Sequence, residues 1–249
     1  MLEVRGLGKA YGDTVAIREL TFTIEAREFV CIVGPSGCGK TTLLKCVSGL
    51  LPATGGEVVL NGRRIDAPPP EMALVFQDYG RSLFPWMTVR QNVAFPLRRK
   101  PLGAHDRERL VGETLAAVGL DGFADHYPWQ VSGGMQQRVA IARALAYQPE
   151  ILLMDEPFAS VDAQTRGDLE DLVLRVWQEY QVTVLFVTHD IDESVYLAGR
   201  VLVLAPRPTS VRESVAIDLP RPRDQVETKA SSEFARLRTH VYTEIRQPR

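Results

Sequence analysis

The segment from Gly34 to Thr42, GPSGCGKTT, restricts the folds open to this 249-residue chain more than any other feature. It follows a short apolar run, residues 29–33, and leads into an apolar-faced segment, residues 43–50. This order predicts a strand, a loop and a helix. Glycines let such a loop curl until successive backbone N–H groups point at phosphate oxygens, and the helix adds the positive end of its dipole. The segment therefore predicts a phosphate-binding loop inside an α/β fold.

Two side chains at the end of this loop carry the chemistry of a nucleotide site. Lys40 supplies a mobile charge for β- and γ-phosphates, and the hydroxyl of Thr41 is placed to ligate Mg²⁺. The alternative is a glycine-rich turn without a ligand, but every residue of the pattern stands at the required spacing. The residues predicted to contact the nucleotide here are Gly34, Pro35, Ser36, Gly37, Cys38, Gly39, Lys40, Thr41 and Thr42.

Two carboxylates follow a second apolar run, residues 151–154, which is typical of a strand covered on both faces. In parallel sheets ligands bind beyond the carboxyl ends of the strands. We expect Asp155 to be a direct or water-mediated partner of Mg²⁺, and Glu156 to polarise the attacking water as general base. Two acids at a strand end are by themselves a weak signal, but the phosphate loop beside them favours the catalytic interpretation.

A histidine follows a third apolar run, residues 182–187. Because this run ends at the same edge of the predicted sheet, His189 can hydrogen-bond a γ-phosphate and the water that attacks it. A single histidine is usually structural, so this interpretation depends on the neighbouring phosphate loop.

A second predicted anion site opens the helical stretch 137–147. Two glycines after a serine, at the start of a helix, resemble an anion-binding helix terminus. One phosphate loop already holds the phosphates of a nucleotide, so this site is best explained if it serves the nucleotide of a neighbouring subunit. The alternative is a flexible helix cap. The residues concerned are Ser132, Gly133, Gly134 and Met135.

The remaining pattern predicts a helical lobe inserted into an α/β core. Charged helical segments fill residues 80–145, and an aromatic pair, Phe84 and Trp86, lies near the start of this region. After it, strands alternate with helices, which implies a parallel sheet with helices on both sides. Further strands are expected at residues 2–5, 15–25, 56–62 and 201–204, with an Asn-Gly turn closing the strand at 56–62.

Composition excludes several classes of protein. The formal net charge of −2 argues against a dedicated nucleic-acid binder, which normally carries a basic excess. No run approaches the ~18 apolar residues of a membrane helix, and the first residues do not form a secretory signal. Cys31, Cys38 and Cys46 lack the spacing of a zinc site and are expected to be reduced, packed thiols. We expect a soluble chain that serves a membrane only by docking.

Taken together and in order, these motifs resemble the ATP-binding subunits of ATP-binding-cassette (ABC) transporters, over residues 2–205. Gly34–Thr42 and Ile151–Glu156 match the two Walker motifs, Ser132–Gln136 matches the family signature, and His189 matches the switch histidine. The signature reads VSGGM where the commoner form is LSGGQ. Met135 lacks a side-chain amide, but the hydroxyl of Ser132 and the backbone donors remain, so activity is expected to survive.

The same resemblance assigns three further residues. Gln77 matches the Q-loop glutamine, with a catalytic and metal-contacting role beside Thr41 and Asp155. Asp162 matches the D-loop aspartate, within Ser160–Ala163. Tyr11 stands where the family stacks an aromatic ring on adenine.

The fold implied by the resemblance is a P-loop NTPase of the RecA-like α/β class: a parallel-sheet core, an N-terminal antiparallel β-subdomain and an inserted α-helical lobe. Residues 1–205 are expected to form the ATPase domain, with the lobe at about 80–145. Residues 206–249 are expected to be a C-terminal extension that ends in a solvated helix. The alternative for this basic tail is contact with anionic lipid or a regulatory partner.

The implied activity is ATP hydrolysis with ATP and Mg²⁺, by Glu156, His189 and Gln77. The implied partners are a second identical or similar subunit, head to tail with two ATP molecules between them, and transmembrane permease subunits. A substrate-binding protein is an indirect partner, and no nucleic acid is expected. The implied place is the cytoplasmic face of the inner membrane, where the chain is peripheral.

Short segments, including Phe84-Pro85-Trp86 and Asp218–Arg223, are similar to bacterial importers of nitrate, taurine, alkanesulfonates and related small anions. We expect the region from Gln77 to Trp86 to dock the membrane subunit. The alternatives are a soluble ABC-type ATPase acting on DNA or ribosomes, a non-catalytic nucleotide sensor, and an exporter motor. A soluble ATPase acting on DNA or ribosomes usually carries a long coiled coil or two cassettes in tandem. A non-catalytic sensor would lack Lys40 or Glu156. An exporter motor shares the catalytic residues, so only the subfamily resemblance opposes it.

Overall fold

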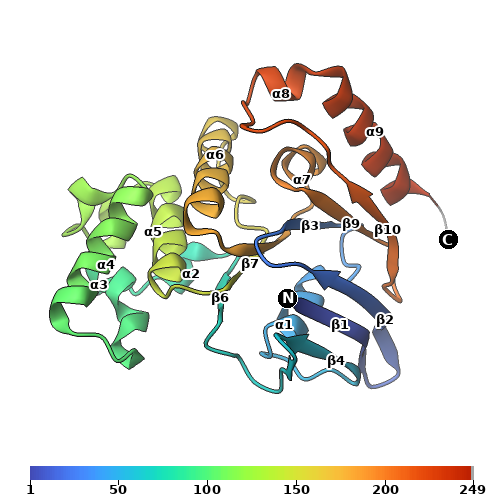
Figure 1. Cartoon of the computed structure of the whole chain (residues 1–249), viewed down its shortest axis with the longest axis horizontal. Coiled ribbons are helices and arrows are strands. Elements are labelled where there is room, and N and C mark those ends of the chain that lie inside the picture. The colour runs from blue at the N-terminus through green and yellow to red at the C-terminus, as the bar shows by residue number, and fades with distance from the viewer. Residues whose placement is uncertain (248–249) are drawn as a thin grey trace.

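The computed structural model describes residues 1–247, apart from the side chains of Tyr79 and Arg81. A large sheet lies at the centre, with a helical lobe at one side and a smaller sheet beneath the other (Figure 1). None of the helices among the described residues is both long enough and apolar enough to cross a membrane.

The larger sheet has six strands in the order β10-β9-β3-β8-β7-β6. Five of them run parallel, and β10 is antiparallel at one edge. The strands are β3 (Phe29–Val33), β6 (Met72–Val75), β7 (Ile151–Asp155), β8 (Thr183–Val187), β9 (Arg200–Leu204) and β10 (Val211–Ala216). Sequence patterns predicted β3, β7, β8 and β9. They missed β6, because four residues after three prolines are too few to show a period.

The sheet is buried on both faces, which explains the continuous apolar runs. Successive side chains of a strand point to opposite faces. Along β3, Phe29, Cys31 and Val33 therefore enter one core with the helices α6 (Ala163–Tyr180) and α7 (Ile191–Leu197), while Val30 and Ile32 enter a second core with α1 (Lys40–Val47).

The smaller sheet is antiparallel, in the order β2-β1-β4-β5. Its strands are β1 (Leu2–Tyr11), β2 (Thr14–Ile24), β4 (Gly55–Leu60) and β5 (Arg63–Arg64). Asn61 and Gly62 both have positive φ, as a two-residue hairpin of this kind requires, so the predicted Asn-Gly turn is present. Apolar residues of this sheet pack onto α1, which places the sheet beside the loop that precedes α1.

The helical lobe is inserted between β6 and β7 of the core in the amino-acid sequence, as predicted for the fold class. Its helices are α2 (Tyr79–Ser82), α3 (Val89–Ala94), the 3₁₀ helix η1 (Phe95–Arg99), α4 (Ala104–Ala117), η2 (Asp121–Phe123), η3 (Pro128–Gln130) and α5 (Gly133–Ala146). The sequence predicts that the last of these starts at residue 137. It begins at Gly133, because the side chain of Ser132 caps it by accepting a hydrogen bond from the Met135 N–H at 3.3 Å.

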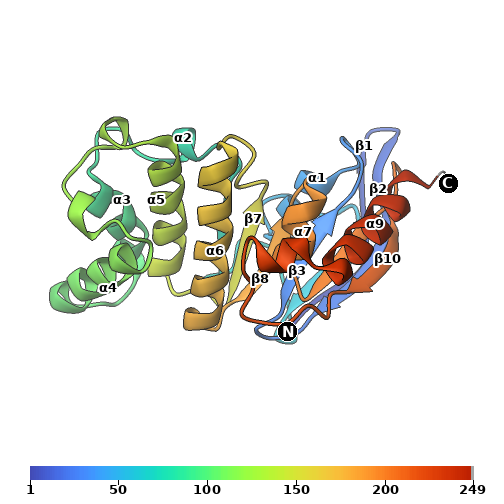
Figure 2. The ribbon, with the colours of Figure 1, turned by 90° about the horizontal axis from the view of Figure 1, so that it is seen from above.

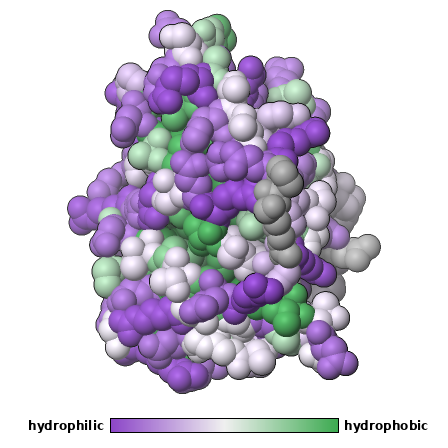
Figure 3. All heavy atoms as spheres, turned by 90° about the vertical axis from the view of Figure 1, so that its right-hand side faces the viewer, coloured by the Kyte–Doolittle hydropathy of each residue, from purple (hydrophilic) through white to green (hydrophobic). Residues whose placement is uncertain are grey.

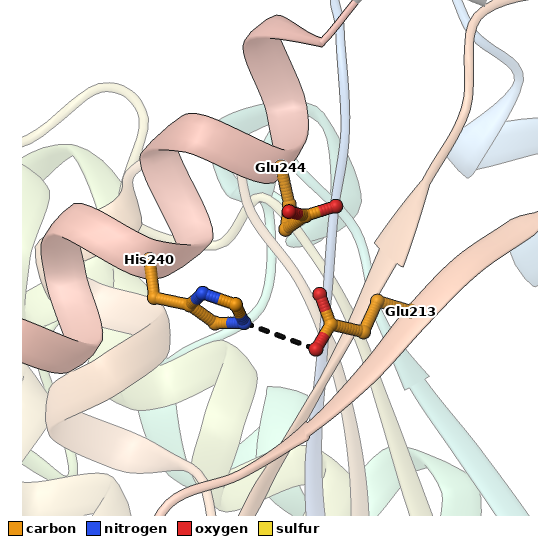
Figure 4. Close-up of side chains that lie close together, drawn as sticks. All are labelled: Glu213, His240 and Glu244. Atoms are coloured by element: carbon orange, nitrogen blue, oxygen red, sulfur yellow. Dashed lines mark hydrogen bonds and ion pairs between the residues drawn. The ribbon is translucent and has the colours of Figure 1, made fainter.

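The segment after residue 205 is joined closely to the core. It contributes β10 to the main sheet and then forms α8 (Glu227–Ala230) and α9 (Ser232–Arg246). The expectation of a solvated terminal helix is wrong, because α9 buries Phe234, Leu237 and Val241 in the main core. Figure 4 shows His240 and Glu244 of α9 pointing toward Glu213 of β10, with His240 Nε2 3.0 Å from a Glu213 carboxylate oxygen. The face on the side of α9, β10 and β2 is mostly hydrophilic, with apolar residues in narrow streaks (Figure 3).

Candidate functional site

The predicted phosphate loop joins β3 to α1 and is shaped by its glycines. Gly37 and Gly39 have φ of 72° and 112°, a region that residues with a Cβ atom rarely adopt. Gly34 is required for a different reason: a Cβ atom there would lie 3.0 Å from Leu204 Cβ and 3.1 Å from Cys38 Sγ. The loop therefore adopts a tightly curled form that rests on the end of β9.

Lys40 lies over this loop and is almost completely buried. Its Nζ atom donates to the carbonyl oxygens of Gly34 and Pro35, at 3.0 and 3.3 Å, and lies 4.0 Å from Oε1 of Glu156. A buried ammonium group held at the mouth of the loop is a charge that can be offered to phosphate oxygens.

Thr41 and Asp155 bring two oxygens together next to Lys40. The hydroxyl of Thr41, at the start of α1, donates to Oδ1 of Asp155 at 3.3 Å. Burial raises the pKa of Asp155, and the nearby Glu156 acts in the same direction, while the hydrogen bond from Thr41 opposes both. Mg²⁺ prefers oxygen ligands, and the hydroxyl of Thr41 and the carboxylate of Asp155 supply two of them side by side, so these two residues fit a magnesium ion.

Glu156 follows β7 directly and has a φ of 44°, an unusual conformation for a residue with a side chain. Its N–H donates to the carbonyl of Val187, the last residue of β8, at 2.9 Å. The N–H of Thr188 in turn donates to Ile32 of β3 at 3.1 Å. These bonds hold the carboxyl ends of three neighbouring strands together and bring Glu156 and His189 to one place.

The two predicted catalytic side chains contact each other. Nδ1 of His189 lies 2.9 Å from Oε2 of Glu156. His189 is largely exposed, whereas Glu156 is mostly covered and has Lys40 on its other side. A carboxylate with a basic ring on one side and an ammonium on the other can accept a proton from a water molecule at the mouth of the loop.

Gln77 and Tyr11 come from strands or strand ends that neighbour the elements of this site. Gln77 follows β6, the neighbour of β7, and together with Ser160 lines an open cavity of about 480 Å³. Tyr11 ends β1 and is 51% exposed, with Lys9 Nζ 5.2 Å from its ring centre. The hairpin that carries Tyr11 passes close to the loop, since Ala16 O lies 3.8 Å from the Cβ position of Gly39.

The residues of the predicted second anion site lie at the start of α5, next to the start of α6, which carries the predicted D-loop residue Asp162. Asp162 caps α6: its carboxylate accepts from the N–H of Thr165 at 3.0 Å and from the Thr165 hydroxyl at 2.6 Å, and these bonds lower its pKa. A Cβ atom on Gly134 would lie only 2.5 Å from Cγ2 of Thr165. The second glycine of the pair is therefore required for helix packing, a role that sequence analysis did not assign to it.

The two sets of residues lie apart within one chain. The loop, Lys40, Asp155, Glu156 and His189 gather at one edge of the sheet, whereas Ser132 opens α5 on the lobe. Figure 2 shows α6 and β7 between α5 and α1. The phosphate loop and the helix that Ser132 caps are thus separated by other elements of the same chain.

A buried polar network that no sequence motif indicates lies behind His189. The hydroxyl of Thr188 donates to Oε2 of Glu193 at 2.6 Å and accepts from the N–H of Asp190 at 2.9 Å. Arg166 of α6 bridges Asp190 at 3.0 Å and Glu193 at 3.6 Å. Burial raises the pKa of Glu193 to about 7. The sequence does show that Glu193 lies about one helical turn after Asp190. Acids in the first turn of a helix are usually exposed, however, and only the structure shows that Glu193 is buried.

The fold and this site define a P-loop nucleoside triphosphatase. The family model described as ABC transporter matches residues 17–159. The aliphatic sulfonates import ATP-binding protein of Bacillus anthracis is 42% identical over 233 residues, which are 94% of this chain and 89% of that protein. The nitrate import ATP-binding protein of a Synechocystis strain is 44% identical over 223 residues, 88% of this chain and 83% of that one.

A solved dimeric ATP-binding cassette, in a post-hydrolysis state bound to ADP and phosphate, is 32% identical with a TM-score of 0.75, over 87% of this chain and 99% of that one. The chain therefore belongs to the ABC transporter family. It is an ATP-binding, ATP-hydrolysing cassette, as the motifs predicted.

Proposed function

We propose that this chain powers a membrane importer of a small anion, in the class of nitrate or a sulfonate. The observation that carries the catalytic part of the proposal is the convergence of Lys40, Asp155, Glu156 and His189 at the mouth of the phosphate loop. The names of the relatives support import and the class of substrate.

In this proposal Glu156 is the general base that takes a proton from the attacking water, and His189 orients Glu156 and the γ-phosphate. Lys40 and the loop from Gly34 to Thr42 hold the phosphates, and Tyr11 stacks on adenine. Thr41 and Asp155, with Gln77, would hold Mg²⁺. When bound, that ion neutralises charge on the β- and γ-phosphates.

The second site acts across a dimer in this proposal. A second copy, or a similar subunit, packs head to tail, so that Ser132–Met135 and Asp162 of one chain face the nucleotide on the partner's loop. The separation of the two sites within one chain supports this arrangement. The dimeric state of the related cassette supports it as well.

A permease subunit is proposed to dock on an apolar groove between the lobe and the sheet edge. The groove has a volume of about 320 Å³ and lies between β6 and the helices η1 and α5. Two of its lining residues, Phe84 and Phe95, pack on each other at a centroid distance of 4.6 Å, and the ring of Trp86, 5.5 Å from that of Phe84, is 69% exposed. Phe84 is half-buried, so Trp86 is the exposed member of the pair. Exposed aromatic side chains at a hollow are typical anchors of protein interfaces.

This docking would place the chain at the cytoplasmic face of the membrane as a peripheral subunit. The test of the transport role uses the source organism with this gene deleted. We expect the deletion strain to lose growth on nitrate as sole nitrogen source, or on taurine or an alkanesulfonate as sole sulfur source. The wild-type gene should restore growth, and the Lys40→Ala variant should not. Normal growth of the deletion strain on all these sources would overturn the proposed substrate class.

A further inference from the structure

Thr209 is a buried polar residue that lies against the phosphate loop, although it comes from the connection between β9 and β10. Its exposed fraction is 0%. Its hydroxyl donates a hydrogen bond to the carbonyl oxygen of Cys38, inside the loop. No motif in the sequence includes Thr209, which lies in the segment 206–249 that the sequence predicts to be a C-terminal extension.

The backbone of Thr209 is fixed from the other side by β2. Its N–H donates to the carbonyl of Ala16 at 3.1 Å, and its own carbonyl accepts from the N–H of Arg18 at 3.1 Å. Thr209 therefore joins the phosphate loop to the hairpin that carries Tyr11. Because the N–H and the carbonyl of Thr209 are both hydrogen-bonded, its backbone is held in place, and its hydroxyl is positioned beside the carbonyl of Cys38.

The planarity of the peptide bond makes this contact relevant to phosphate binding. In a trans peptide the carbonyl of one residue and the N–H of the next point in opposite directions. When the Cys38 carbonyl is held by Thr209, the N–H of Gly39 is turned away from Thr209. We propose that Thr209 is a positioning residue that fixes the Cys38–Gly39 peptide so that the Gly39 N–H faces the phosphates of ATP.

The orientation of the Cys38–Gly39 peptide needs a fixed contact because Gly39 is conformationally free. Its φ of 112° lies in the positive region, which glycine adopts about as readily as the negative one. The backbone at Gly39 can therefore change conformation at little cost. Its Cβ position would lie 3.4 Å from Oγ1 of Thr209, so the two residues are in contact. Without the hydroxyl, the peptide can rotate in the free protein, and binding must then order it.

This inference rests on the proposal that Gly34–Thr42 hold the phosphates, so the experiment includes a variant that tests that proposal separately. Thr209→Val keeps the β-branched shape and removes the hydroxyl, and Thr209→Ser keeps the hydroxyl and removes the methyl. The matched control is Thr114→Val. Thr114 is also fully buried, and its hydroxyl donates to the Leu110 carbonyl at 2.6 Å within α4 of the lobe. Lys40→Ala tests the loop itself.

The measurements are the dissociation constants of ATP and of inorganic triphosphate, and the melting temperature of each free protein. Hydrogen bonds to charged groups are the stronger ones. We therefore expect Thr209→Val to weaken ATP and triphosphate about tenfold each, because the loss concerns phosphates and not the base. Thr209→Ser should stay within about twofold of the wild type, and so should Thr114→Val, even if it melts at a lower temperature.

ATP affinity within twofold of the wild type in Thr209→Val would overturn the inference, and so would an equal loss in Thr209→Ser. If Thr209→Val does not fold, Thr209→Ala must show the same tenfold loss for both ligands. Lys40→Ala distinguishes a failure of the loop assignment from a failure of the role of Thr209. Unchanged triphosphate binding in Lys40→Ala would overturn the loop assignment, whereas a weak Lys40→Ala beside a normal Thr209→Val overturns only the role of Thr209.

Discussion

Nδ1 of His189 lies 2.9 Å from Oε2 of Glu156, although the two residues are 33 positions apart in the chain and each follows a different strand of the sheet. The contact exists because β7 and β8 are parallel neighbours, with Asp155 opposite Val187, so that both strands end at the same level. Glu156, the first residue after β7, and His189, the second residue after β8, then enter the same space. A carboxylate and an imidazole are thus brought together by the register of the sheet.

Replacing Glu156 by Gln should separate ATP binding from ATP hydrolysis. The amide keeps the size of the side chain but cannot accept a proton, so the chemical step should slow by about 10² to 10⁴. Lys40, Thr41 and Asp155 still hold the phosphates, so the variant should accumulate as an ATP-loaded dimer. Size-exclusion chromatography with and without Mg-ATP, together with phosphate release, measures both effects. Near-normal turnover of the variant would shift the role of base to His189.

Replacing Tyr11 by Ala should weaken ATP binding without weakening triphosphate binding. Aromatic–base stacking is worth about 1–3 kcal/mol, and the ring is exposed at the margin of the site. Triphosphate has no base, so its dissociation constant should not change. Equal affinity for ATP in the variant and the wild type, measured by titration, would mean that adenine stacks elsewhere.

Replacing Trp86 by Ala should reduce co-purification with the permease subunit while ATP affinity stays normal. Truncation of an aromatic anchor typically costs about 2 kcal/mol or more at an interface. The matched control is Trp129→Ala, because Trp129 is 70% exposed on the same lobe but stacks on Tyr127, which does not line the groove, whereas Trp86 packs against the groove residue Phe84. Loss of ATP binding in Trp86→Ala, or an equal effect of both variants, would contradict the proposed docking surface.

The stability of the protein should depend on the protonation of Glu193. Burial, with Asp190 and Glu170 nearby, raises its pKa from 4.5 to about 7, while Thr188 and Arg166 act in the opposite direction. The folded state therefore binds the proton more tightly than the unfolded chain. The stabilising contribution is complete below pH 4.5 and is lost as the pH rises to about 7.

The Glu193→Gln variant has no such proton to lose. Its free energy of unfolding, relative to the wild type, should therefore increase between pH 5 and pH 8. Urea titrations at the two pH values measure this difference. A difference that does not change with pH would show that Glu193 titrates normally in the folded protein.

Replacing Gly134 by Ala should destabilise the protein, although alanine is the better helix former by about 1 kcal/mol. The new Cβ atom would meet Cγ2 of Thr165 at 2.5 Å, and overpacking of this kind costs about 1–3 kcal/mol. Thr165→Ser removes that methyl group and keeps the hydroxyl that binds Asp162. The double variant should therefore recover the lost stability in thermal unfolding. A double variant no more stable than Gly134→Ala alone would show that the clash is not the cause.

Local patterns were sufficient for the elements that carry chemistry. The loop from Gly34 to Gly39, the runs that became β3 and β7, and the Asn-Gly turn each have a signature within a few neighbouring residues. Such signatures arise because backbone conformation and phosphate binding impose requirements on adjacent positions. The fold class and the set of motif residues could therefore be predicted from the amino-acid order.

Contacts between distant segments had no such signature. Thr209 meets Cys38 across 171 residues, and Thr165 meets Gly134 at the start of another helix. The burial of α9 and the groove beside Phe84 are also of this kind. Each depends on which surfaces the packed sheet and helices bring together, and that is set by the sum of many apolar contacts along the whole chain. For this reason the amino-acid order was enough to predict the chemistry of the site, whereas only the packed chain decided which distant residues lie against it.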